Sequence, residues 1–216
     1  MASTDEATAY PAPLPHGPLR ELFDDVFWVQ GSINMRRGVR ISRNMVVLRQ
    51  GGDLTLVNPV RLNAEGEAAL AALGTVRHAI RLGAFHGMDD AYTVEHFGAQ
   101  FWCQAGSKRF QEPSPDHPFD EGTGLPIDDA EAFVFHHAKL PEGAILLRRH
   151  GGLLITCDGV QDWTDMSRCS LAARLIMPFM GFKRTTIIGP LWLKFMTPDG
   201  GSLRPDFERL LDFEFD

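Results

Sequence analysis

The sequence predicts a mixed α/β protein, arranged as a four-layered αββα sandwich. Strand-like hairpins come first, a strand–helix–strand unit follows, and further hairpins and then helices complete the chain. This order suits two facing sheets covered by helices better than a doubly wound sheet, in which strands and helices alternate throughout. The chain has 216 residues, and a typical domain has about 100–200, so one large core is expected.

Residues 26–58 have the pattern of antiparallel hairpins. Apolar runs at 26–30 and 44–49 are typical of strands, and a Gly-Gly turn leads directly into a third strand at 53–58. We therefore expect these three segments to form neighbouring strands of one sheet.

A helix and two further strands are expected next. Asn63 stands where a helix N-cap belongs, acidic residues follow in the first turn, and Gly74 comes just past the last apolar residue. Residues 76–82 read as a strand, and residues 91–103 as a helix followed by a short strand.

The second half of the chain begins with a long loop, residues 105–128, rich in proline and glycine. Long loops in compact domains are often functional. An apolar helix is expected at 167–180, a final helix at 205–211 and the start of a strand at 213–215. Before these helices we expect strands at residues 132–137, 144–149 and 153–158.

The composition of the N-terminal segment predicts how the chain is organised. Residues 1–18 are rich in alanine and proline, and they are expected to form a flexible N-terminal arm ahead of a single domain at 19–216. The arm has neither the basic nor the apolar region of a secretory signal. No apolar run approaches the ~20 residues that span a bilayer, so we expect a cytoplasmic protein.

The charge and the cysteines exclude several classes of function. With 28 acidic and 21 basic residues the formal net charge is −7, and no basic stripe interleaves with aromatic residues. Nucleic acid is therefore not an expected partner. Cys103, Cys157 and Cys169 are odd in number and widely spaced, which does not suit a disulfide framework and fits a reducing compartment.

The loop after the strand at 76–82 carries a candidate metal site, with His86 and Asp90 four residues apart. Together with the order of elements before it, this loop resembles the H-x-H-x-D-H motif of the metallo-β-lactamase fold. The resemblance covers roughly residues 26–216. It implies that His86 and Asp90 bind metal, and that Asp90 alternatively acts as a general base towards a bound water.

Two later segments extend the resemblance. The family has a further histidine ligand before a Gly-Asp, and His136 and His137 precede Asp158 at a similar spacing. Neighbours in a strand face opposite sides, and His137 alternates with buried-type phenylalanines, so His137 is the preferred ligand. Asp158 then resembles the family's bridging aspartate. Cys157 is expected to point away from it, into the core.

This sequence also departs from the family motif. Met88 and Ala91 stand at the second and fourth ligand positions of the motif, and Asn58 stands where an aspartate usually ends the first hairpin. The family's last ligand, a histidine in a C-terminal turn, has no counterpart before Asp216, as though the fold were truncated. The resemblance therefore implies at most one metal ion, held by His86, Asp90, His137 and Asp158.

Each candidate ligand has a structural alternative. His86 could cap the helix that follows it, and Asp158 could serve a turn. Asp89 and Asp90 both precede a helix and are good N-caps, since their carboxylates accept from backbone N–H groups. Capping is the favoured role for Asp89, whereas capping and ligation are balanced for Asp90.

Two functions remain open. The first is a metal-dependent hydrolase of a small ester, lactone or thioester, with one zinc, iron or manganese ion. The second is a non-catalytic binding or structural module that keeps the fold and holds no metal, since fold alone does not imply function. An apolar helix within 169–182 is expected in the core, with homodimerisation through it as the alternative.

Overall fold

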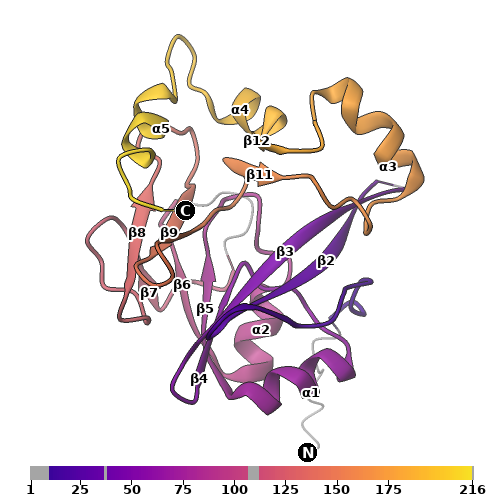
Figure 1. Cartoon of the computed structure of the whole chain (residues 1–216), viewed down its shortest axis with the longest axis vertical. Coiled ribbons are helices and arrows are strands. Elements are labelled where there is room, and N and C mark those ends of the chain that lie inside the picture. The colour runs from indigo at the N-terminus through magenta and orange to yellow at the C-terminus, as the bar shows by residue number, and fades with distance from the viewer. Residues whose placement is uncertain (1–9, 37, 107–111, 216) are drawn as a thin grey trace, which may run out of the picture.

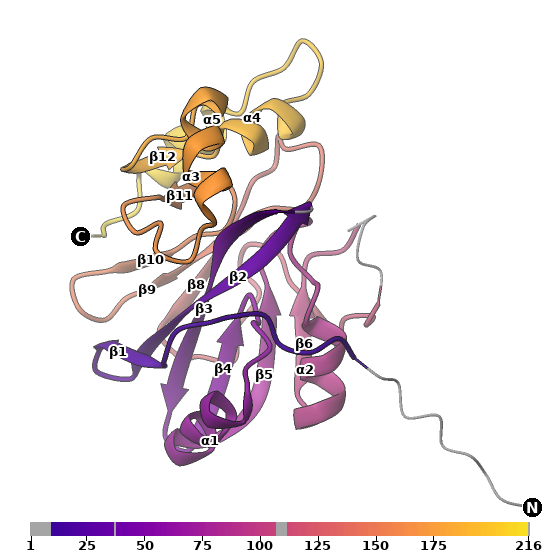
Figure 2. The same ribbon diagram turned by 90° about the vertical axis from the view of Figure 1, so that its right-hand side faces the viewer.

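The computed structural model describes residues 10–36, 38–106 and 112–215, and it confirms the four-layered αββα arrangement (Figure 1). A seven-stranded sheet and a three-stranded sheet pack face to face, and helices cover their outer sides. Figure 2 shows α1 and α2 beside the larger sheet, with α3, α4 and α5 gathered at the opposite end of the molecule.

The larger sheet has the strand order β1-β2-β3-β4-β5-β6-β7. Its first four strands pair antiparallel, as the hairpin pattern predicts, and the later pairs are parallel. Parallel neighbours need a crossover, and α1 (Ala64–Leu73) and α2 (Asp90–Phe97) supply the first two. The strands are β1 (Arg20–Phe23), β2 (Val26–Arg36), β3 (Val39–Gln50), β4 (Asp53–Val57), β5 (Thr75–Arg81), β6 (Gln100–Cys103) and β7 (His117–Pro118).

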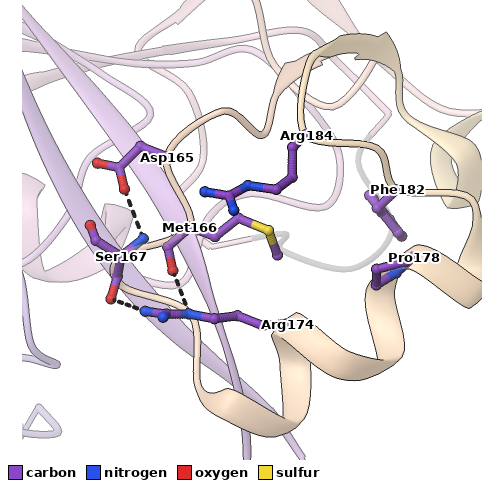
Figure 3. A pocket seen from close by; sticks show the side chains of 7 residues that line it. All are labelled: Asp165, Met166, Ser167, Arg174, Pro178, Phe182 and Arg184. Atoms are coloured by element: carbon purple, nitrogen blue, oxygen red, sulfur yellow. Dashed lines mark hydrogen bonds between the residues drawn. The ribbon is translucent and has the colours of Figure 1, made fainter.

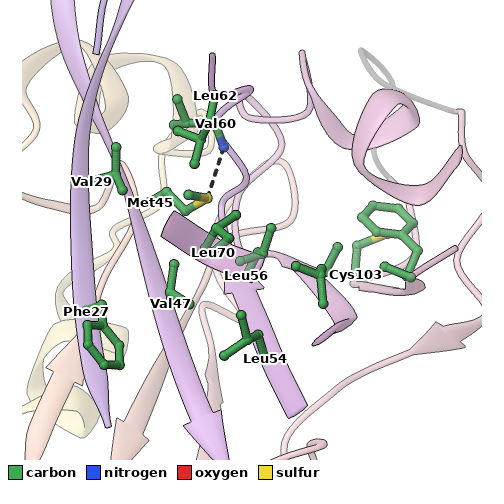
Figure 4. Packing of buried hydrophobic residues seen from close by; sticks show 14 residues of the cluster. Phe27, Val29, Met45, Val47, Leu54, Leu56, Val60, Leu62, Leu70 and Cys103 are labelled. Carbon is green, nitrogen blue, oxygen red and sulfur yellow. Dashed lines mark hydrogen bonds between the residues drawn. The ribbon is translucent and has the colours of Figure 1, made fainter. Parts of the chain in front are cut away.

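The predicted cap of α1 is confirmed. The Asn63 side chain accepts a hydrogen bond from the Gly66 amide at 2.9 Å, and the amide of Gly74 donates to Leu70 at the other end. Between these caps α1 packs Leu70 against the sheet. Figure 4 shows this outer core, in which side chains of β2, β3 and β4 meet Leu70.

Alternation along the strands sends neighbouring residues into two different cores. Phe27, Val47 and Leu56 face α1 and α2. Val26, Leu48 and Val57, their immediate neighbours, face the smaller sheet. The middle of the larger sheet is therefore buried on both sides, as its largely apolar segments 45–48 and 54–57 indicate.

The smaller sheet has the order β10-β9-β8, and all of its pairs are antiparallel. Its strands are β8 (Ala130–Val134), β9 (Gly143–Leu147) and β10 (Leu153–Ile155). Every residue of the central strand β9 is buried. Ile145 and Leu147 pack towards the larger sheet, whereas Ala144 packs towards the outer helices.

Helices α4 (Pro190–Met196) and α5 (Arg204–Leu210) form the outer layer over the smaller sheet. Their buried anchors include Trp192 and Leu210. The fully buried carboxylate of Asp206 in α5 accepts hydrogen bonds from the amides of His136 and His137 at 3.1 and 2.8 Å. This carboxylate therefore ties α5 to the chain that leaves β8.

The strands β11 (Val160–Asp162) and β12 (Thr186–Ile188) form a small two-stranded sheet. The chain between them forms α3 (Leu171–Ile176) and the 3₁₀ helix η1 (Met177–Met180). The predicted helix at 167–180 is thus shorter than expected, because its α-helical part begins only at Leu171. Ser170 caps that start, its side chain accepting from the Ala173 amide at 3.2 Å. Pro178, which has no amide donor, lies in the 3₁₀ segment.

Both ends of the chain differ from expectation in detail. Residues 10–18 have no regular structure but are held to the surface: the Ser32 hydroxyl donates to Pro15, and the Gly17 amide donates to Gln30 at 2.7 Å. Residues 1–9, the rest of the predicted flexible arm, lie outside the described residues. Residues 213–215 form no strand. None of the helices in the described ranges combines the length and apolar character needed to cross a membrane.

Shortening Ile145 tests the core between the sheets. Because its side chain is fully buried, Ile145→Val should lower the free energy of unfolding by about 0.5–1.5 kcal/mol and Ile145→Ala by about 2–5 kcal/mol. Urea unfolding followed by circular dichroism measures both. Leu211→Ala, at a side chain that is mostly exposed, is the matched control and should change stability by less than about 0.5 kcal/mol. Equal losses for Ile145→Ala and Leu211→Ala would contradict a shared core.

Candidate metal site

Three segments meet where β5 ends, β9 begins and β10 ends. The first is the loop that carries His86, the second is Glu142 immediately before β9, and the third is the turn at Cys157 and Asp158. The larger sheet supplies the first segment and the smaller sheet supplies the other two. The site therefore lies at the junction of the two sheets.

His86, Cys157 and Asp158 form a cluster of potential metal ligands. One ligand atom from each lies within 4.8 Å of the others. His86 Nε2 and Asp158 Oδ2 are 3.6 Å apart, and both side chains remain partly exposed. Cys157 is buried behind them. The structure thus brings together two of the residues that the sequence indicated, His86 and Asp158.

The expectation that Cys157 points away from Asp158 is wrong. It assumed a strand through residues 153–158, in which neighbours alternate. The strand β10 ends at Ile155, so Cys157 and Asp158 lie in a turn and can face the same site. The expectation that Cys157 is a core residue is confirmed, since it belongs to the core between the two sheets, and the turn also brings its sulfur close to His86 and Asp158.

Glu142 is a member of the site that sequence reasoning missed. Its side chain is fully buried, Oε1 accepts from the Gly159 amide at 2.7 Å, and Oε2 has no hydrogen-bond partner among the described residues. A buried carboxylate oxygen without a donor is costly. The sequence feature that could have indicated Glu142 is its position directly before the run 143–147, which has no polar side chain.

Gly83 explains how the carboxylate and the thiol approach each other. A Cβ at this position would lie 2.6 Å from Cys157 Sγ and would also collide with Glu142 Oε2. Real Cβ atoms do not tolerate such contacts, so only glycine fits here. Gly83 also forms an isolated β-bridge with Glu142, which joins the two sheets at this point.

Burial and negative charge shape the electrostatics. Burial, reinforced by the charge of Asp158, raises the pKa of Glu142 well above its usual value. Burial, together with the charges of Glu142 and Asp158, likewise raises the pKa of the Cys157 thiol. Three acidic groups thus share a poorly solvated site. A bound cation would reverse both shifts, because it stabilises the charged forms.

Two amide side chains brace the site. Gln161 donates to Asp158 Oδ1 at 3.1 Å, which leaves Oδ2 directed at His86. Asn58 has a positive φ of 52° at the end of β4, and its side-chain oxygen accepts from the Leu82 amide at 3.0 Å. Asn58 therefore holds the end of β5 in place.

Asp90 lies behind the cluster and not in it. Its fully buried carboxylate accepts from Arg81 at 3.1 Å, and Arg81 also donates to Cys103 Sγ at 3.4 Å. Burial raises the pKa of Asp90 to about 6, although Arg81 and His86 oppose this shift. Asp89 occupies the N-cap position of α2, but its carboxylate makes no capping bond and instead pairs with Arg43.

His137 lies away from the cluster. Its ring Nδ1 is 3.1 Å from Asp206 Oδ1, and half of its side chain is exposed. The expectation of a buried ligand assumed that the strand continued to residue 137. The strand β8 ends at Val134, so the alternation with Phe133 and Phe135 stops before His137. His136 is also exposed and faces Glu121.

The donor set of the site fits a metal ion. An imidazole nitrogen, a thiol sulfur and a carboxylate are the side chains that zinc prefers. Glu142 adds a buried carboxylate beside the Cys157 thiol, and a cation there would stabilise its charged form, although the Trp192 side chain also interacts with this carboxylate. Met88, at the second motif position, is exposed and offers no hard donor.

Comparisons at the level of sequence find no relative. No protein-family model matches the chain, and no curated protein is similar to it.

Solved structures are similar at the level of fold. The chain is similar to DIM-1 metallo-β-lactamase exposed to ceftazidime, with 9% identity and a TM-score of 0.57 over 70% of this chain and 74% of that one. Another DIM-1 structure gives 11% identity and a TM-score of 0.54, over 68% and 73% of the two chains. FIM-1 from Pseudomonas aeruginosa in its mono-zinc form gives 14% and 0.50, over 63% and 66%. Together with the two facing sheets and their helical covers, these likenesses establish that the chain has the metallo-β-lactamase fold.

Proposed function

We propose that this protein is a hydrolase of a small ester, lactone or thioester that depends on one bound metal ion. The observation that carries the proposal is the convergence of His86, Cys157 and Asp158, whose ligand atoms lie within 4.8 Å of one another. These residues would hold the metal, with Glu142 as the fourth protein group beside them. Only one such group occurs within the described ranges, which supports a mononuclear site.

The donor atoms favour zinc among the three candidate metals. A thiolate sulfur is a soft ligand that suits zinc, whereas manganese prefers oxygen ligands. Among the structures of this fold, FIM-1 has been described in a mono-zinc form, which supports a single zinc here. When bound, such an ion polarises a substrate carbonyl and lowers the pKa of a bound water to about 7.

Residues around the metal would position the substrate and the ligands. The partly exposed His86 and Asp158 face solvent, so substrate would approach from their side. Gln161 orients the Asp158 carboxylate. Glu142, buried next to the Cys157 thiol, would lie beside the metal as a carboxylate and add negative charge to the site. We assign Asp90 a positioning role through Arg81, because both are buried behind the His86 loop.

The cytoplasm is the proposed location. Cys157 must stay reduced to bind metal, and the three cysteines are free and buried.

A metal-free binding module is the second candidate. The observation that favours it is the 3.6 Å separation of His86 Nε2 and Asp158 Oδ2, because a protonated histidine could pair with this carboxylate directly. The exposed Met88, at a motif position that offers no ligand, points the same way. This candidate expects the purified protein to contain no stoichiometric metal.

Metal content separates the two candidates. Elemental analysis of untagged protein should find about one equivalent of zinc, and His86→Ala or Asp158→Asn should lose it. His137→Ala is the matched control and should keep the metal, because His137 lies at Asp206. No zinc above background in the wild type, even after reconstitution, would favour the metal-free module. Loss of zinc in His137→Ala would contradict the site described above.

Cobalt substitution tests the thiolate ligand. Protein loaded with Co²⁺ should show a sulfur-to-metal charge-transfer band in its absorption spectrum, because Cys157 Sγ belongs to the cluster. Cys157→Ser should abolish the band while circular dichroism stays unchanged. Cys169→Ser, at a second buried free cysteine, is the control and should keep it. A band that survives in Cys157→Ser would assign the ligand elsewhere.

The buried Asp90 should make stability depend on pH. Its folded-state pKa of about 6 lies above the usual aspartate value of 3.8, so the folded protein binds the proton more tightly than the unfolded chain. The contribution is therefore most favourable below pH 4 and is lost as pH rises through 6, by about 3 kcal/mol in total. Urea unfolding from pH 4 to 7 measures this loss, using metal-free protein. Asp90→Asn should remove the slope, and an unchanged slope would contradict the assignment.

A further inference from the structure

One segment of this acidic protein has the opposite charge. Residues 166–198 contain five arginines and lysines and no aspartate or glutamate, whereas the whole chain has a net charge of −7. The segment includes α3, η1, β12 and α4. The five cations are Arg168, Arg174, Lys183, Arg184 and Lys194.

The same segment exposes large apolar side chains. Leu171, Leu175 and Phe179 are 71%, 62% and 93% exposed along α3 and η1, and we call these three residues the apolar ridge. Phe195 on α4 is 58% exposed. Contiguous exposed side chains of this size mark an interaction surface. The prediction that the apolar side chains of this helix lie in the core is therefore wrong for Leu171, Leu175 and Phe179, and the buried side chains are instead Ala173 and Met177.

A pocket of about 340 Å³ opens beside the apolar ridge (Figure 3). Arg174 and Arg184 line it together with the apolar side chains of Met166, Pro178 and Phe182. Arg174 is fixed by hydrogen bonds to the carbonyls of Met166 and Ser167, at 3.1 and 2.9 Å. The one acidic residue at the rim is Asp165, whose carboxylate accepts from the Ser167 amide at 2.7 Å.

We propose that the segment 166–198 docks this protein onto a membrane surface that contains anionic lipid. The apolar ridge would enter the boundary between headgroups and acyl chains, and the exposed cations Lys183, Arg184 and Lys194 would face the anionic headgroups. Exposed leucine and phenylalanine flanked by lysine and arginine is the composition of helices that lie in this interface. Each cation near an anionic surface strengthens binding by a factor of about five.

The charges favour a lipid surface over a second copy of this chain. A symmetric dimer through the apolar ridge would bring the same patch together from both copies, and it would oppose two sets of cations, which outnumber the nearby carboxylates such as Asp165. In Figure 1, α3 lies at the tip of the β2–β3 hairpin, and its buried Ala173 packs on β3 while the ridge stays exposed. The helix therefore presents the ridge to a flat partner.

Vesicle sedimentation tests the proposal. The full-length protein is mixed with vesicles of phosphatidylcholine alone or with about 30% phosphatidylglycerol, at low and at physiological salt. Binding should require phosphatidylglycerol and should weaken as salt screens the cations. Equal binding to both vesicle types, or to neither, would overturn the proposal.

Two variants divide the apolar and charged contributions. Phe179→Ser should weaken binding about tenfold, because it removes the most exposed apolar side chain. The double variant K183Q/R184Q should weaken it about thirtyfold, at the factor of about five for each cation. Leu22→Ser on β1 and Arg77→Gln on β5 are matched exposed controls and should bind like the wild type.

Sedimentation velocity without vesicles tests whether a second copy of this chain binds the apolar ridge instead. The wild type and Phe179→Ser should have the same mass. A wild-type dimer that Phe179→Ser turns into a monomer would overturn the membrane proposal and assign the ridge to a second copy. Because no residue of the metal site is changed, zinc content should be the same in all of these variants, so the outcome is independent of the proposed hydrolase.

Discussion

The site depends on one buried carboxylate at the junction of the two sheets. Glu142 pairs its backbone with Gly83 after β5, and its carbonyl accepts from the Phe135 amide at 3.0 Å. Its side chain accepts from Gly159, directly after the Cys157–Asp158 turn. One residue thus joins both sheets and the turn between β10 and β11. The same residue that organises the junction therefore also places a buried negative group beside Cys157 and Asp158.

The architecture could be read from the sequence because its signals are local. The Gly-Gly turn, the Asn63 cap and the alternation in β2–β4 each act within a few residues, and the structure has them as expected. The ends of strands were harder to predict, because nothing local stops an apolar run. Continuing β8 to His137 and β10 to Asp158 assigned the wrong faces to His137 and Cys157. Glu142 was missed because its importance comes only from contacts across the chain.

The site and the fold carry different amounts of information about function. Neighbours at 9–14% identity establish the arrangement of layers, yet the positions that would carry the chemistry have changed. Histidine and aspartate remain at 86 and 158, whereas Met88 and Ala91 cannot serve as ligands. The potential donor atoms at this junction also include the Cys157 sulfur and the Glu142 carboxylate oxygens. Among the described residues, one closely spaced group of potential ligands is present, at His86, Cys157 and Asp158.

The uneven distribution of charge makes the molecule an electric dipole. The segment 166–198 contains five cations and no carboxylate, although Asp165 and Asp199 flank it, and the remainder of the chain is more acidic than the net charge of −7 suggests. Electrostatic attraction orients the molecule as it approaches a negatively charged surface, so that the cationic segment contacts that surface first. A separation based on net charge alone would therefore misjudge it: a cation-exchange resin can retain this acidic protein by one end.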